Sequence, residues 1–325
     1  MNIAVDIVAQ PRLGKTFYPC SGHRLQPQPL VLIHGWGADS QIWGDLPQQL
    51  SEWADVITLD LPGFGASEAL QHYSADSMLQ WMHRALPDQS LLLGLSLGGM
   101  LCHRYAATYP QRVSGLILLS SNRQFVADAG YQSAMPQADF DGFLHSWQND
   151  PNSCLKRFAS LQAQGDRQQR QLIRQLRAMQ VNMDPQAAEA LLGLLGQLNN
   201  HQQCPPLPSL SLFGGQDALV PPEAARQSTN SVVIEGAAHL PHLSAPQQVV
   251  DQIYGFLDRQ RYQLDKPAVA ESFGRAASSY DESAKLQHRI GEQLLSHRSS
   301  QTQPAPDSIV DLGCGTGYHS IQLQR

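Results

Sequence analysis

A serine between glycines is the residue of this 325-residue chain best suited to chemistry. The run Gly94-Leu95-Ser96-Leu97-Gly98 follows an apolar stretch at 91–93 and precedes a helical pattern over 100–107. A serine on a sharp strand-to-helix turn presents its hydroxyl above a sheet, and small residues are needed two positions away because the backbone is crowded there. The pattern predicts that Ser96 is a nucleophile. Ordinary glycine-rich turns share this spacing, so the assignment depends on partner residues.

Two further side chains are required for that chemistry. A serine hydroxyl is a weak nucleophile unless a histidine accepts its proton and a carboxylate orients the histidine. With this type of turn, the partners follow in the order Asp, His. Asp217 follows the strand-like run 210–213, and His239 follows the run 231–234. We predict Asp217 as the acid and His239 as the base; the alternatives are a turn-forming aspartate at 217 and a base at His242.

Acyl transfer also creates an oxyanion, which needs two N–H donors. The N–H of Leu97 is one candidate. The second is the N–H of Trp36, because a strand-like run at 30–33 leads into a His-Gly-Trp-Gly loop. His34 in that loop and Asp60 after the next strand are expected to hold loops in shape.

A long insertion separates the strand-like run 116–119 from the run that begins at 210. It holds leucines at helical spacing, which predicts a helical lid over about 123–205. Lids of this kind shape the substrate pocket and present a surface to the rest of the substrate.

Residues 154–177 of the lid are basic although the chain carries a formal net charge of -6. One acid, Asp166, stands among the basic residues Lys156, Arg157, Arg167, Arg170, Arg174 and Arg177. On one helix the last four would form a stripe. Two interpretations remain open: a lid helix solvated by arginines, or a docking surface for an acidic partner. Nucleic acid is disfavoured, because the basic residues are local and no nucleic-acid motif accompanies them.

The motifs together resemble the α/β-hydrolase superfamily over roughly residues 25–258. They are His34-Gly35-Trp36-Gly37, Asp60-Leu61-Pro62-Gly63-Phe64-Gly65, the run around Ser96, Asp217-Ala218-Leu219-Val220-Pro221 and Ala237-Ala238-His239. The resemblance implies an α/β fold with a mostly parallel sheet flanked by helices and an inserted helical lid. We expect this domain to span residues 1–260.

Within that superfamily, the segment 157–162 and the two glycine-rich loops are similar to biotin-pathway esterases that demethylate pimeloyl-[acyl-carrier protein] methyl ester. Leu95 departs from those relatives, where an aromatic residue is expected. The resemblance implies an acyl pocket that involves Trp36, Leu97, Phe158, Ala159, Ser160, Leu161 and Gln162. It also implies that acyl carrier protein docks on Arg157, Arg170 and Arg174. A general short-chain carboxylesterase, a C–C bond hydrolase or a non-catalytic ligand binder are the alternatives.

The C-terminal residues 261–325 resemble a second family. The stretch 269–281 is similar to the start of malonyl-[acyl-carrier protein] methyltransferases, and the strand-like run 309–312 leads into a glycine-rich turn. In that family this turn is the first S-adenosylmethionine motif, which here comprises Asp311, Gly313, Gly315 and Gly317. Because the sequence ends soon after this motif, we expect an incomplete S-adenosylmethionine site and a truncated, non-functional methyltransferase-like segment.

Composition narrows the remaining classes. With 42% apolar and 15% charged residues, the chain is typical of a protein with one sizeable core. We find no secretion signal and no apolar run near the roughly 20 residues that span a bilayer, so we expect a cytoplasmic protein. Five cysteines at scattered spacings predict neither disulfides nor a zinc site. We expect an esterase that needs no metal or cofactor and acts as a monomer.

Overall fold

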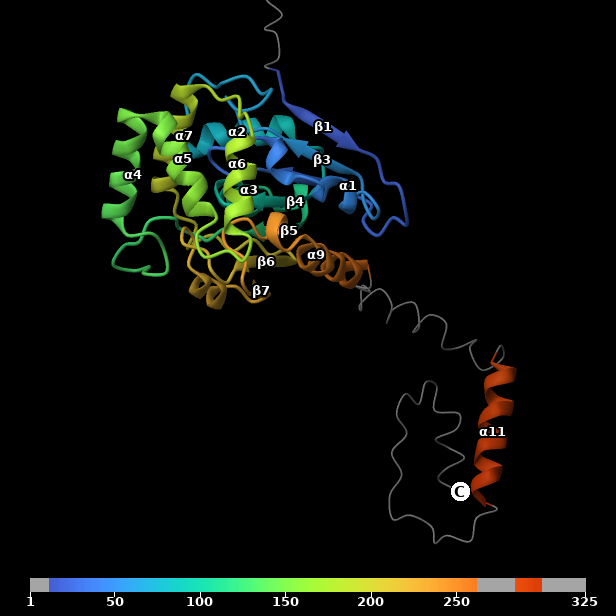
Figure 1. Ribbon diagram of the computed structural model, residues 1–325. Coiled ribbons are helices and arrows are strands. Elements are labelled where there is room, and N and C mark those ends of the chain that lie inside the picture. The colour runs from blue at the N-terminus through green and yellow to red at the C-terminus, as the bar shows by residue number, and fades with distance from the viewer. Residues whose placement is uncertain (1–11, 262–283, 300–325) are drawn as a thin grey trace, which may run out of the picture. The chain divides into compact units, whose positions relative to one another are not determined.

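The computed structural model describes residues 12–261 and 284–299 (Figure 1). The chain divides into two compact units, residues 1–261 and 262–325, and each is described by itself. The first unit contains an α/β fold, as the sequence predicts.

A seven-stranded sheet forms the centre of the first unit, in the order β1-β3-β2-β4-β5-β6-β7. The strands are β1 Lys15–Tyr18, β2 Leu30–Ile33, β3 Val56–Leu59, β4 Ser90–Leu95, β5 Val113–Leu119, β6 Ser209–Gly214 and β7 Ser231–Ile234. All neighbouring pairs are parallel except β1 with β3. The carboxyl ends of six strands therefore meet along one edge, where the candidate residues follow them.

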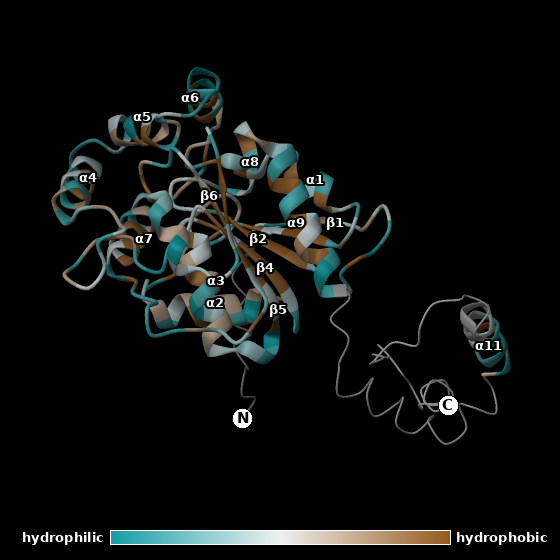
Figure 2. Ribbon diagram, turned by 90° about the horizontal axis from the view of Figure 1, so that it is seen from below, coloured by the Kyte–Doolittle hydropathy of each residue, from teal (hydrophilic) through white to brown (hydrophobic). Residues whose placement is uncertain are grey.

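Helices cover both faces of the sheet because its parallel strands are apolar on both sides (Figure 2). In the first unit the helices outside the lid are α1 Leu46–Leu50, α2 Ala75–Ala85, α3 Leu97–Thr108, α8 Pro241–Ser244 and α9 Pro246–Arg261. Leu30 and Leu32 belong to the core that includes α1 and α9, whereas Val31 and Ile33 belong to the core that includes α2 and α3. Short 3-10 helices occupy Ser40–Trp43, Pro110–Arg112 and Pro222–Gln227.

The lid lies between β5 and β6 in the sequence and contains four helices, which gather beyond one end of the sheet (Figure 2). They are α4 Gln137–Asn149, α5 Pro151–Gln162, α6 Gln169–Ala178 and α7 Pro185–Gln197. Proline opens α5 and α7, and a carboxylate caps each: Asp150 accepts from the N–H of Ser153, and Asp184 from the N–H of Ala187. Local sequence therefore starts both helices.

The lid segment between α6 and α7 is hydrogen bonded to the loop after β3. The N–H of Gly65 donates to the carbonyl of Asn182 at 2.7 Å, and the N–H of Asp184 donates to the carbonyl of Gly63 at 2.7 Å. The Asn182 side chain donates in turn to the carbonyl of Gly65 at 2.9 Å. These bonds tie the lid to the sheet edge at a point far from its two ends.

The described part of the second unit is helix α11, Lys285–Ser299, with Leu286 and Ile290 exposed. The predicted S-adenosylmethionine motif, Asp311 to Gly317, lies outside the described residues. Across both described segments, no helix is apolar and long enough to cross a bilayer.

Candidate active site

Ser96 stands alone between β4 and α3 with φ 51° and ψ -118°. A non-glycine residue in this region is strained, and such strain is common where a nucleophile must be presented. The glycines around it are required by close packing. A Cβ on Gly94 would overlap the backbone of Gly99, and a Cβ on Gly98 would overlap the carbonyl oxygen of Ile33. The helix after Ser96 is thereby pressed against the end of β2.

The loop after β2 lies directly against the nucleophile, because a Cβ on Gly35 would lie 3.2 Å from the Cβ of Ser96. His34 shapes this loop: its Nδ1–H donates to the carbonyl of Gly35 at 2.8 Å, and its Nε2 accepts from the N–H of Leu61 at 2.9 Å. Complete burial lowers the pKa of His34, which keeps the ring neutral and able to accept at Nε2. The loop that carries Trp36 is therefore fixed beside Ser96.

Asp217 and His239 form a buried pair, with Asp217 Oδ2 2.8 Å from His239 Nδ1. Their side chains are 0% and 2% exposed. The other carboxylate oxygen accepts from the N–H groups of Leu219 and Val220, which fixes the acid. An ionised carboxylate only accepts, so Nδ1 of the histidine carries the proton and Nε2 is left to accept one. This is the arrangement that a general base needs.

The rival histidine, His242, lies in a different setting. Its Nε2–H donates to the carbonyl of Ile42 at 2.9 Å, and its ring lies against Trp43. Complete burial lowers the pKa of His242 to about 4. It therefore holds the 3-10 helix before α1 and makes no hydrogen bond to Asp217.

A narrow apolar cavity adjoins Ser96. Its lining comprises Trp36, Ser96, Phe125, Met135, Phe143, Phe158, Leu192, Leu195 and Leu219. The ring of Trp36 meets those of Phe143, Trp147 and Phe158 at centroid distances of 5.1 to 5.4 Å, and its Nε1–H donates to the carbonyl of Ala188 at 2.7 Å. Trp36 thus joins the loop after β2, which lies beside Ser96, to lid helices α4, α5 and α7.

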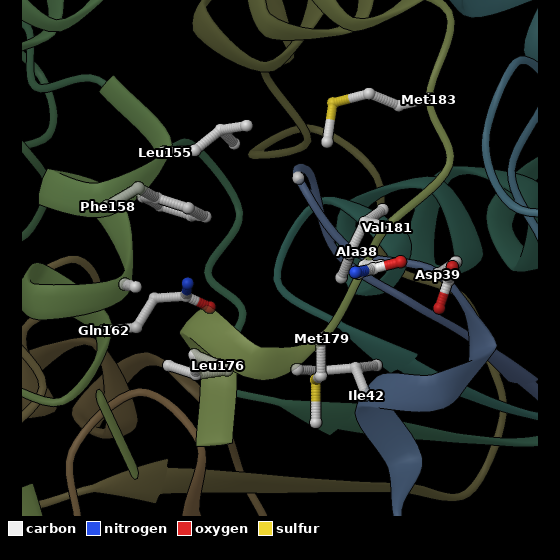
Figure 3. A pocket seen from close by; sticks show the side chains of 13 residues that line it. Ala38, Asp39, Ile42, Leu155, Phe158, Gln162, Leu176, Met179, Val181 and Met183 are labelled. Carbon is white, nitrogen blue, oxygen red and sulfur yellow. The ribbon is translucent and has the colours of Figure 1, made fainter. Parts of the chain in front are cut away.

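A second cavity of about 240 Å³ opens between α5, α6 and the loop after β2 (Figure 3). Phe158, Gln162 and Leu176 approach it from the lid, and Ala38, Asp39 and Ile42 approach it from the core domain (Figure 3). Phe158 also lines the cavity at Ser96, so one ring separates the two spaces.

Helix α5 divides the predicted pocket residues between two surfaces. Phe158, Ala159 and Gln162 line the open cavity. Ser160 and Leu161 instead line an outer groove. Lys156, Arg157 and Arg177 line the same groove, and the Ser160 hydroxyl donates to the carbonyl of Lys156 at 3.1 Å. A helix cannot point five consecutive side chains in one direction, which accounts for the division.

The arginine stripe is shorter than the sequence suggests, because α6 begins at Gln169. Arg170, Arg174 and Arg177 lie on it and are exposed, whereas Arg167 precedes it and packs over Gly236. The prediction of a four-arginine stripe on one helix is therefore wrong at its first member. Within residues 12–261, Arg157, Arg170 and Arg174 form no ion pair with a carboxylate.

Asp166 is a residue that sequence reasoning missed as part of the site. Its carboxylate is buried and accepts from the N–H of Ala238 at 2.8 Å and from that of Gln168 at 2.7 Å. Ala238 directly precedes the candidate base. The only available signal was that Asp166 is the sole acid in a basic segment.

Among the described residues, no group of three or more His, Cys, Asp or Glu side chains is placed so that it could hold a metal ion.

Comparisons with known proteins agree with the α/β fold described above. Residues 28–246 match the family model described as alpha/beta hydrolase fold. The chain is 40% identical over 302 residues to the biotin biosynthesis bifunctional protein BioHC of Cellvibrio japonicus, covering 90% of this chain and 60% of that protein. It is 34% identical over 239 residues to the pimeloyl-[acyl-carrier protein] methyl ester esterase of Serratia marcescens, covering 70% of this chain and 93% of that protein.

The chain spans 60% or less of the length of the three bifunctional relatives first matched. Among solved structures, an esterase from Exiguobacterium antarcticum superposes with a TM-score of 0.65 at 19% identity, covering 77% of this chain and 97% of that one. That likeness supports the fold. The chain therefore belongs to the α/β-hydrolase fold family, as its motifs and their geometry indicate, and is a relative of the esterases named above.

Proposed function

We propose that this protein is a serine carboxylesterase that hydrolyses the methyl ester of pimeloyl-[acyl-carrier protein] in biotin biosynthesis, releasing methanol. The observation that carries the proposal is the buried Asp217–His239 pair, at the same edge of the sheet as the strained Ser96. The substrate is proposed from the similarity to the pimeloyl-[acyl-carrier protein] methyl ester esterase of Serratia marcescens.

In this mechanism Nε2 of His239 accepts the Ser96 proton as the hydroxyl oxygen attacks the ester carbonyl. The backbone N–H groups of Trp36 and Leu97 are proposed to bind the resulting oxyanion. The imidazolium then protonates the methoxide, which leaves as methanol. Water, deprotonated by the same imidazole, then attacks the acyl-enzyme. The bond from the acyl carbon to the Ser96 oxygen breaks, the imidazolium returns the proton to that oxygen, and the free carboxylic acid is released. Asp217 orients the imidazole throughout and stabilises its cationic form.

The two cavities suit the two ends of such a substrate. The narrow cavity at Ser96 is lined almost entirely by apolar side chains, which suits the methyl ester group. The open cavity beyond Phe158 has an apolar lining from Leu176, Met179 and Met183, which suits the methylene chain and the arm that leads to the carrier.

Acyl carrier protein is proposed to dock on the exposed basic face of α5 and α6, through Arg157, Arg170 and Arg174. These three arginines have no carboxylate partner among the described residues, so they are available to pair with carboxylates and phosphates of another protein. The outer groove lined by Lys156, Arg157 and Arg177 extends the same positive surface.

The test compares hydrolysis of pimeloyl-[acyl-carrier protein] methyl ester with that of a free short methyl ester. The double variant Arg170→Glu, Arg174→Glu reverses two charges of the proposed docking surface. It is expected to raise KM for the carrier-linked substrate by about tenfold or more, because two attractive contacts with the acidic carrier protein become repulsive. Hydrolysis of the free ester should be unchanged.

The matched control is Arg84→Glu with Arg226→Glu, two exposed arginines outside the lid that give the same change in net charge. Equal rates on both substrates, unchanged by reversal in the lid, would instead support a general short-chain esterase with a solvated lid.

Residues 262–325 are proposed to be a methyltransferase-like segment. The match to bifunctional relatives covers 90% of the chain, more than the first unit alone holds, and this favours the proposal.

A further inference from the structure

Lid residues 162–168 are hydrogen bonded to the region that follows β7 and carries His239. The bonds run from His239 N–H to Gln162 O (3.1 Å), from Ala238 N–H to Asp166 Oδ2 (2.8 Å), from Arg167 N–H to Gly236 O (2.9 Å) and from the Gln168 side-chain amide to Ser244 O (2.7 Å). Two of these lid acceptors bind consecutive backbone N–H groups that end at the histidine itself.

Asp166 is built into this contact. It is 6% exposed, and its second oxygen accepts from the N–H of Gln168, so both oxygens are used. A buried carboxylate with two N–H donors has a defined position, since each lost bond leaves a costly unpaired group.

The neighbouring residues close the contact further. Gly236 has φ +76°, and a Cβ there would overlap the guanidinium of Arg167. The lid segment therefore lies flat on the loop, and the loop needs glycine both for its backbone angle and for this approach.

We propose that Asp166 is a positioning residue for the base His239. The proposal rests on the proposed function in one respect, that His239 is the base. Asp217 fixes the imidazole ring from one side, while Asp166 and the carbonyl of Gln162 fix the backbone from the other. Asp166 acts only through the backbone, and a displacement of the base of about 1 Å is enough to slow proton transfer strongly.

The experiment measures kcat and KM for p-nitrophenyl acetate, a small ester that needs no carrier. Asp166→Ala is expected to lower kcat by about tenfold or more with KM changed less than about twofold, because the base is displaced while the binding cavity is kept. Asp166→Asn retains a carbonyl oxygen for the N–H of Ala238 and should recover most of the lost kcat. The rate at which a fluorophosphonate labels Ser96 should follow the same order.

Asp184→Ala is the matched control, since Asp184 also accepts a backbone N–H in the lid but caps α7. Unchanged kcat in Asp166→Ala, an effect on KM alone, or an equal loss in Asp184→Ala would overturn the proposal. Thermal unfolding identifies a variant that fails to fold; in that case Asp166→Asn decides, and a kcat below one tenth of wild type with a native melting curve would count against the backbone contact.

His239→Ala and the carrier-linked substrate keep the two proposals apart. An active His239→Ala protein would overturn both. Suppose instead that His239→Ala is inactive and that the wild type does not hydrolyse the carrier-linked ester. That result would remove the proposed substrate and leave the role of Asp166 standing.

Discussion

The three proposed catalytic residues are held in three different ways. Ser96 is presented by a strained backbone that its neighbouring glycines allow. Asp217 is fixed by two N–H groups, so its second oxygen faces His239. His239 is held at the ring by the acid and at the backbone by the lid.

Replacing Asp217 with asparagine tests the orientation of the base. The single amide oxygen is expected to keep the bonds from the N–H groups of Leu219 and Val220, so the amide NH2 faces Nδ1 of His239 and donates to it. The imidazole is then expected to adopt the wrong tautomer and kcat to fall by about 10⁴-fold. Ser96→Ala should abolish turnover with the fold intact. Steady-state hydrolysis of a methyl ester and circular dichroism check both, and an active Ser96→Ala protein would refute the assignment.

Buried histidines predict a pH-dependent stability. His242 has its pKa lowered to about 4 by burial, against 6.5 ordinarily. Below pH 6.5 His242 binds a proton in the unfolded chain but stays neutral in the folded chain. Its contribution to the free energy of unfolding is therefore fully present above pH 6.5 and is lost as the pH falls toward 4. Between pH 7 and pH 5 the free energy of unfolding should fall by about 2 kcal/mol through this residue.

Urea unfolding at both pH values measures this loss. His242→Gln keeps an N–H donor for the carbonyl of Ile42 but does not titrate, so its stability should depend less on pH. His103 lies in a similar setting, with its pKa lowered to about 4 chiefly by burial, and should retain its own share. A pH dependence identical in wild type and variant would contradict this account.

At the scale of elements, two helical glycines make opposite predictions. A Cβ on Gly98 in α3 would overlap the carbonyl of Ile33, whereas a Cβ on Gly142 in α4 would meet nothing within 4 Å. Gly142→Ala should stabilise the protein by about 0.5–1 kcal/mol, because glycine costs entropy in a helix. Gly98→Ala should destabilise it, since backbone cannot move aside cheaply. Melting temperatures compare the two, and a stabilised Gly98→Ala protein would be the contrary result.

The elements around the site were largely predictable because their signals are local. β2 and β7 have the predicted bounds of 30–33 and 231–234, and each candidate follows its strand as expected. The division of α5 between two surfaces was not foreseen, since it depends on which helix face the core covers. Asp166 was missed for a related reason: its partner, Ala238, is 72 residues away, and no local pattern records such a bond.

At the scale of the whole molecule, the division into two units predicts that the first unit is active by itself. The family match ends at residue 246, inside the first unit. A chain ending at 261 is therefore expected to keep the esterase rate of the full chain within about twofold, because all proposed catalytic residues precede that point. Measured hydrolysis of a free methyl ester by both chains checks this, and a large loss would show that the second unit supports the first.

The place where the lid enters the fold bears on how such enzymes diversify. The chain enters the lid after β5 and returns to the sheet at β6. These two strands are adjacent and parallel, so an insertion of almost any length can be accommodated without disturbing the sheet. Evolution could thus exchange lids to change substrate while inheriting the hydrolytic machinery. The bonds from residues 162–168 to the histidine loop restrict that freedom: a transplanted lid must bring its own acceptors for the N–H groups of Ala238 and His239. Chimeric enzymes that omit them would inherit the pocket of the donor without its speed.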